Sequence, residues 1–133
     1  MPLSTYANGV IMNHVFRGNV AGTNMAQLSS MYLALHTADP TEAGLLSTEV
    51  SGGGYTRQLV RFSSPSGDQI TTSSAVSFSN MPACTVNHLS VWDEDDNMWI
   101  YDGIAPQAVG SNDTLTWAAG TLSLKFEVSD SEI

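Results

Sequence analysis

Positive charge is scarce in this sequence. Four Lys and Arg residues face thirteen Asp and Glu residues, so the formal net charge is −9 at pH 7. Binding to DNA or RNA depends on a cationic face that displaces counterions. Adsorption to anionic membranes depends on basic residues in the same way. The charge balance therefore argues against both nucleic acid and membrane surfaces as partners.

Cysteine and long apolar runs are also scarce. The single Cys84 cannot form an intramolecular disulfide, and we interpret it as a small buried residue. No apolar run reaches 18 residues and no basic leader precedes a hydrophobic segment, so we expect neither a membrane span nor a signal peptide. A chain of 133 residues is the size of one domain and can bury a core without disulfides or metals.

The main pattern in the sequence is the alternation of side chains with a period of two. In Met31–Thr37, Tyr32, Ala34 and His36 alternate with apolar neighbours, a period of two that predicts a strand with two distinct faces. Pro40 ends this strand because it lacks a ladder donor. A polar loop, Thr41–Gly54, follows, and Tyr55–Phe62 is expected to form a second strand.

Five further strands are expected between clusters of Gly, Pro, Ser and Asp: Ser74–Ser79, Thr85–Trp92, Met98–Ile104, Asn112–Trp117 and Thr121–Val128. Short strands separated by such clusters predict a mainly β chain, 1–133, folded as one domain. Its body, 31–128, is expected to be an antiparallel β-sandwich or a jelly-roll-like barrel.

A short helix is expected near the start, within 1–18. Ser4 or Thr5 is placed to cap it and Gly18 to end it. Its apolar stripe has i, i+4 spacing and consists of Tyr6, Ala7, Val10, Ile11, His14 and Val15. We expect this stripe to pack on the sheet of the same chain or on a neighbouring subunit.

An acidic segment, Asp93–Asn97, begins like a calcium-binding loop. The pattern then fails, because Met98 stands where glycine is needed and Ile104 where a bidentate glutamate belongs. We interpret the segment as a hairpin turn between strands, and we expect no metal or other cofactor.

No catalytic motif is evident. His36 and Asp39 are spaced as a base and its orienting carboxylate, but no serine or cysteine motif accompanies them, and G-x-S-x-G is absent. Asp39 before Pro40 is better explained as a turn residue. The sequence therefore predicts a protein that is not an enzyme.

Arg57 is one of few cations and follows a glycine run. We expect it to pair with Glu49 or Asp39 in the preceding loop, so that its planar guanidinium, next to Tyr55, pins that loop to the sheet.

The same loop is a candidate contact for a partner. Leu45, Leu46 and Val50 are apolar positions in an otherwise polar segment, as expected for an arm that reaches a neighbour. The alternative is that the loop folds back over the core of its own chain.

Two segments, LALHTADPTEAG and STEVSGGGYTRQ, together with the terminal AGTLSL, resemble a family of small tailed-phage virion proteins. Members are often labelled phage tail fibre proteins, and similar small proteins serve as capsid decoration (cement) subunits. The resemblance implies a structural role in the virion, assembled in the host cytoplasm, and it carries no catalytic signature.

Within that resemblance we favour a capsid decoration subunit, whose expected partners are the major capsid protein and further copies in a homotrimer. The chain is short and acidic and lacks the repeats or coiled coil of a long fibre. A tail fibre or tail adaptor bound to tail proteins is the first alternative. A carbohydrate-binding module is the second, with Trp92, Trp99, Trp117 and Tyr101 as stacking residues, although their strand positions favour core burial.

Overall fold

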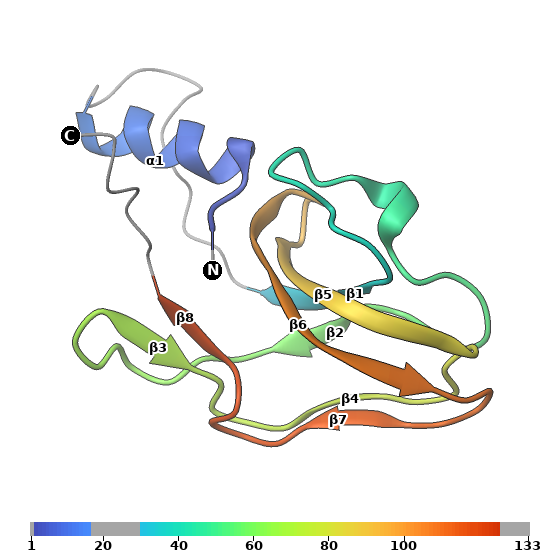
Figure 1. The fold of residues 1–133 in the computed structure, drawn as a ribbon. Helices are drawn as coiled ribbons and strands as arrows, with labels where there is room; N and C mark the ends of the chain where they lie inside the picture. The colour runs from blue at the N-terminus through green and yellow to red at the C-terminus, as the bar shows by residue number, and fades with distance from the viewer. Residues whose placement is uncertain (1, 17–29, 126–133) are drawn as a thin grey trace.

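The computed structural model describes residues 2–16 and 30–125 (Figure 1). One helix, α1, and one short 3-10 helix, η1, accompany eight strands in these ranges. In chain order the elements are α1 Thr5–Phe16, β1 Met31–His36, η1 Leu46–Thr48, β2 Gln58–Val60, β3 Gln69–Thr71, β4 Val76–Phe78, β5 Cys84–Asp93, β6 Met98–Val109, β7 Leu115–Trp117 and β8 Ser123–Lys125.

The strands form one large sheet and two ribbons, all antiparallel. The large sheet has the strand order β2-β1-β5-β6, while β3 pairs with β8 and β4 pairs with β7. The two ribbons lie below the large sheet in Figure 1. The expected mainly β, antiparallel fold with one N-terminal helix is therefore confirmed, and its layered arrangement fits a sandwich.

The main core lies between the large sheet and the ribbons. Leu33 and Leu35 of β1 face it, as the alternation in this strand predicts, and the ribbons contribute side chains such as Phe78. In ribbon strand β4, Val76 and Phe78 are buried and Ser77 between them is exposed, as expected of a strand with one face on the core. The buried members are Leu33, Leu35, Val50, Val60, Val76, Phe78, Met81, Val86, Leu89, Val91, Ile100 and Val109.

The opposite face of the large sheet is also covered. Ala34 and Trp92 form a second, small apolar cluster with Met98, and His36 on the same face is fully buried. The cover is the loop between β1 and β2, in which Thr37 N–H, just after β1, donates to Thr48 O at 3.0 Å. The loop then crosses to the main core at Val50.

Several strand boundaries differ from those expected. Only Gln58–Val60 of the expected strand Tyr55–Phe62 is paired in the sheet, because the segment before it turns its side chains to contacts with the loop. Strand β3 was not expected, since three residues beside a Gly-Asp turn show no clear alternation. Strand β6 extends past Ile104 to Val109. Residues 126–128 of the expected final strand lie outside the described residues.

Helix α1 forms where the capping pattern predicts. The Ser4 hydroxyl accepts a hydrogen bond from Ala7 N–H at 3.0 Å and donates one to the carbonyl of Met98, so the cap also ties the helix to β6. Ala7 is the buried residue of the helix, whereas Val15 and Phe16 are exposed. The apolar stripe is therefore only partly covered by its own chain. Gly18 lies outside the described residues.

No helix within residues 2–16 and 30–125 has the length and hydrophobicity needed to cross a membrane.

The glycine run in the loop permits a close approach of two backbones. Gly53 has a positive φ of 56°, and a Cβ built there would lie 2.8 Å from Asn80 O and 2.9 Å from Pro82 N. Gly54 N–H donates to the same Asn80 carbonyl at 2.7 Å. A side chain at position 53 would force these backbones apart and strain φ.

We expect Gly53→Ala to lower the free energy of unfolding by more than the roughly 1–2 kcal/mol typical of a left-handed residue. The matched control is Gly67→Ala, because Gly67 also has a positive φ, 64°, but a Cβ there would meet nothing within 4 Å. Urea unfolding of both variants separates the steric effect from the backbone effect. Equal losses in the two variants would contradict the close-approach account.

Candidate functional site

A polar cluster fastens the loop between β1 and β2 to the second face of the large sheet. We call it the clamp cluster, and it consists of His36, Thr48, Glu49, Tyr55, Arg57, Ser90, Trp92 and Asp96. Its members come from β1, the loop, β5 and the β5–β6 turn. Segments far apart in the chain therefore meet at this one place.

Arg57 is the centre of the cluster. Its Nε and Nη2 donate to the two carboxylate oxygens of Glu49 at 3.0 and 2.9 Å, a bidentate pair. Its Nη1 donates to Asp96 Oδ1 at 3.0 Å, at the turn between β5 and β6. The guanidinium also lies 4.0 Å from the centroid of the Trp92 ring, so the cation stacks on a buried aromatic face.

Tyr55 supports the same carboxylate from the core side. Its hydroxyl donates to Glu49 Oε2 at 2.7 Å and accepts a bond from Leu35 N–H at 3.0 Å. Its ring stacks on Phe78 with centroids 5.9 Å apart. Burial and the bond to Glu49 raise the pKa of Tyr55, so its hydroxyl remains a donor.

The charges of the pair are stabilised despite their partial burial. Burial by itself would raise the pKa of Glu49, but hydrogen bonds from Arg57 and Tyr55 outweigh it and leave that pKa below its ordinary value. Burial would lower the pKa of Arg57, and Glu49 more than compensates, so the pKa of Arg57 is raised. Both groups therefore stay ionised near neutral pH.

His36 lies within a chain of hydrogen bonds in which each group donates to the next in the same direction. The Thr48 hydroxyl donates to Leu45 O at 2.8 Å, so it accepts from His36 Nδ1–H, also at 2.8 Å. The Nε2 atom is then unprotonated and accepts from the Ser90 hydroxyl at 2.6 Å. Ser90 Oγ in turn accepts from Trp92 Nε1–H at 2.6 Å. The fold thus selects one neutral tautomer of His36.

Burial lowers the pKa of His36 to about 4, although Glu49 nearby acts in the opposite direction. A second proton on Nε2 would face the Ser90 hydroxyl and leave that hydroxyl without its acceptor. The imidazole is therefore a structural link between β1, β5 and the loop, and its hydrogen-bonding capacity is fully used.

The two carboxylates expected near Arg57 have different partners in the structure. Glu49 forms the ion pair, whereas Asp39 Oδ1 accepts a bond from Thr41 N–H at 2.8 Å and shapes the turn after β1. His36 does not face Asp39 as a base faces its carboxylate, since both ring nitrogens have other partners. Asp96 was missed, because the sequence contains no sign that the 93–97 turn reaches Arg57. That Tyr55 and Arg57 hold the loop in place remains a prediction.

Val50, one of the three expected partner contacts, is buried in its own chain. It is only 5% exposed, lies in the main core and donates its N–H to Leu35 O, so it anchors the loop to its own chain. Leu45 and Leu46 are 44% and 64% exposed. The segment therefore folds back on the core of its own chain while two of its leucines stay exposed, and a contact of these leucines with a partner stays a prediction.

The acidic segment forms the hairpin turn that the sequence predicts. The Asp93 carboxylate accepts bonds from Asp95 N–H, Asn97 N–H and Trp99 Nε1–H, at 2.9, 3.0 and 3.0 Å. Burial acts against ionisation, but these donors hold the pKa of Asp93 below its ordinary value. Across the described residues no three His, Cys, Asp or Glu side chains are grouped to hold a metal ion.

The tryptophans have separate packing partners. Trp92 is buried under Arg57, Trp117 meets Phe78 edge to face at 6.1 Å, and Trp99 meets Tyr6 edge to face at 5.6 Å. Tyr101 is half-buried beside the small cluster around Trp92. The expected core burial therefore holds for Trp92, whereas Trp99 and Trp117 are half-buried.

Comparison with protein families decides the class of protein. The family model described as "Podophage GP4 fiber I protein gp80" matches residues 2–125, which is nearly the whole chain. The chain belongs to this family. It is therefore a bacteriophage virion structural protein, as the resemblance of its two motif segments implies. No curated protein matches the sequence.

The family assignment and the clamp cluster both fit a structural role for this protein. Members of a fibre protein family serve as building material, and the structure of this chain uses its polar groups for internal support. Among the described residues, every buried side-chain nitrogen or oxygen has a hydrogen-bond partner. The cluster is thus best understood as a structural device.

We expect Arg57→Ala to lower the free energy of unfolding by about 2 kcal/mol, because it leaves the half-buried Glu49 carboxylate without its cation. Arg57→Lys should recover only part of this loss, since an ammonium group cannot form the bidentate pair. Urea unfolding measures the loss, and limited proteolysis reports loosening of the loop. The control is Arg61→Ala at an exposed position; an equal loss there would contradict a specific role for Arg57.

The lowered pKa of His36 predicts acid sensitivity. Its folded-state pKa is about 4 and its ordinary value is 6.5, so the unfolded chain takes up the proton first as pH falls. The free energy of unfolding should therefore fall by about 3 kcal/mol between pH 6.5 and pH 4 and level off below the folded pKa. Chemical unfolding across this pH range measures the slope.

Two variants isolate this effect. His36→Gln removes the titrating group and should flatten the slope, whereas His14→Gln on the exposed part of α1 should keep it. NMR titration of the parent protein should show a neutral His36 ring down to about pH 4. A ring that titrates near 6.5 would contradict the hydrogen-bond chain described above.

Proposed function

We propose that this protein is a structural subunit of a phage tail fibre or of its attachment to the tail. The observation that carries the proposal is the match to a fibre protein family along residues 2–125. Its function is to provide a rigid β body that contacts neighbouring virion proteins.

The clamp cluster supports this proposal because its contacts are of the kind that would hold a long surface loop in one conformation. Glu49 is tied to Arg57 and Tyr55, and Thr48 is tied to His36, so the segment Leu45–Thr48 is anchored at its C-terminal end. At its other end Leu45 N–H donates to Pro40 O at 2.8 Å. A preordered loop loses little conformational entropy when it binds a partner. Leu45 and Leu46, exposed at this loop, are then the proposed contact with a neighbouring tail protein.

A capsid decoration subunit bound to the major capsid protein is the second candidate. The observation in its favour is the shape of the described part, a small β body with one helix of 12 residues. A decoration subunit stabilises the shell from outside, and a rigid loop with exposed leucines would serve that purpose as well.

Purified virions distinguish these functions. Quantitative gel analysis should give a handful of copies per particle, and density for the chain in electron micrographs should lie at the tail, with Leu45 and Leu46 against a neighbouring chain. Phage that lack the chain should still assemble stable, filled heads. Hundreds of copies arranged over the head, or heads that break without the chain, would overturn the fibre proposal in favour of decoration.

A further inference from the structure

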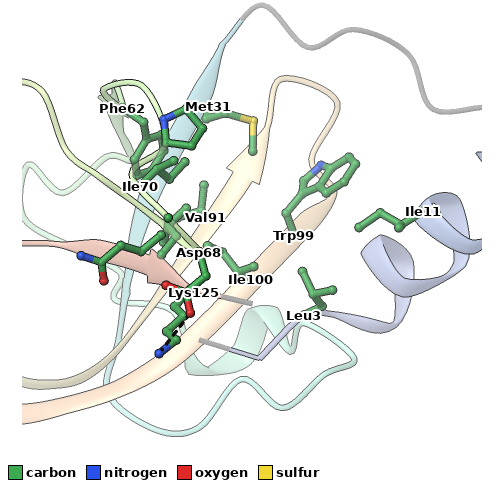
Figure 2. A pocket seen from close by; sticks show the side chains of 14 residues that line it. Leu3, Ile11, Met31, Phe62, Asp68, Ile70, Val91, Trp99, Ile100 and Lys125 are labelled. Carbon is green, nitrogen blue, oxygen red and sulfur yellow. Dashed lines mark ion pairs between the residues drawn. The ribbon is translucent and has the colours of Figure 1, made fainter. Parts of the chain in front are cut away.

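His36 lies where the loop between β1 and β2 meets the second face of the large sheet. Successive residues of β5 point to opposite faces at this place. Val91 lines an apolar hollow together with Phe62 and Ile70, on the side of the main core (Figure 2). Ser90 points to the other face and bonds there to His36. The ring of His36 is thus fully buried between the sheet and the loop, away from the main core.

The part of the loop next to this ring is η1, and it contributes little apolar burial. None of its residues is buried, and Leu46 is 64% exposed. A hollow of about 230 Å³ lies beside it, with Leu46 on the loop side and Trp92 and Met98 on the sheet side of its lining. A segment with few buried apolar contacts separates from a fold at a lower free energy than core strands do.

Hydrogen bonds at Thr48 fasten η1 to the end of β1. Thr48 O accepts from Thr37 N–H at 3.0 Å, and the Thr48 hydroxyl accepts from His36 Nδ1–H at 2.8 Å. Just beyond η1, Val50 is buried in the main core and anchors the chain there. The contact between η1 and β1 can therefore break while the main core remains packed.

A second proton on His36 conflicts with this arrangement. The neutral ring donates through Nδ1 and accepts through Nε2, and its two partners are the hydroxyl groups of Thr48 and Ser90. An imidazolium donates through both nitrogens, but Ser90 is turned toward the ring as a donor and already accepts from Trp92. The new charge would also be buried without water around it. Protonation is therefore favourable only when the ring reaches water.

The charges around the ring do not remove this conflict. Burial is the largest influence on the pKa of His36 and lowers it to about 4. Glu49 of the loop and Asp39 of the turn after β1 favour the charged ring, whereas Arg57 and the cross-strand neighbour His88 oppose it. The Glu49 carboxylate is already paired with Arg57, so it is not available as a direct counter-ion.

We propose that protonation of His36 releases η1 from β1, so that acid opens the loop while the main core stays folded. In the open form both ring nitrogens can donate to water. Because the open form takes up the proton more readily, the equilibrium shifts toward opening as pH falls. The opening is a property of the isolated chain, whereas its effect on a neighbour bound at Leu45 and Leu46 rests on the proposed function.

Hydrogen exchange of the purified full chain, followed for single amides by NMR, tests the proposal between pH 7 and pH 5. Thr37 N–H reports on η1, because its acceptor is Thr48 O. Leu89 N–H, in the interior strand β5, reports on the whole fold. The open ring titrates at the ordinary value of 6.5 and the closed ring at about 4, so protection at Thr37, corrected for intrinsic exchange, should fall about 20-fold.

Two comparisons show whether the opening is local. Protection at Thr37 should be roughly tenfold or more below that at Leu89 at each pH. Dilute urea should accelerate exchange at Leu89 but barely at Thr37, because a local opening exposes little surface. Equal protection and equal urea dependence of the two amides would mean that only global unfolding exposes His36, and this would overturn the proposal.

Variants assign the effect to His36. His36→Gln should remove the fall in protection at Thr37, whereas the change His88→Gln at its cross-strand neighbour should keep it. A parent without the fall, or a fall that persists in His36→Gln, would also overturn the proposal. The parent measurement is decisive even if His36→Gln does not fold. Failure of these tests leaves the proposed function unaffected, since that function is tested in virions.

Discussion

The bidentate pair between Glu49 and Arg57 is the contact on which the arrangement of this protein depends. The loop that contains Glu49 has to leave one face of the large sheet and reach the other. Burial of its polar residues would be unfavourable without hydrogen-bond partners. Arg57 supplies such a partner at the point where the loop crosses. Tyr55 and Trp92 then enclose the pair, so a charged contact becomes part of a packed surface.

This arrangement has a consequence for function. A phage structural protein must present the same surface in every copy, and a long loop is usually the least uniform part of a fold. Here the loop contacts the rest of the chain through the ion pair of Glu49, the ring of His36 and the buried side chain of Val50, contacts that we expect to keep it uniform. The loop therefore exposes Leu45 and Leu46 on a segment that contacts its own chain at several points.

The alternation of side chains predicted the central strands well. Leu33 and Leu35 face the core while Ala34 and His36 face the other side, because burial on one face requires a period of two. The prediction was weaker where strands are three residues long, as in β3, since three residues place only two side chains on one face and one on the other. It was also incomplete at the glycine run, whose close approach to Asn80 involves a distant segment.

Local pattern was sufficient for the mainly β class, the capped helix, the hairpin turn at Asp93 and the membership in a phage virion family. The tertiary structure decided which carboxylate pairs with Arg57, added Asp96 to the pair, and placed Val50 in the core and not on the surface. The physical reason is that periodicity is a property of neighbouring residues. The partner of a charge, in contrast, depends on how a loop folds back and on which distant turn reaches it, as the turn at Asp96 reaches Arg57.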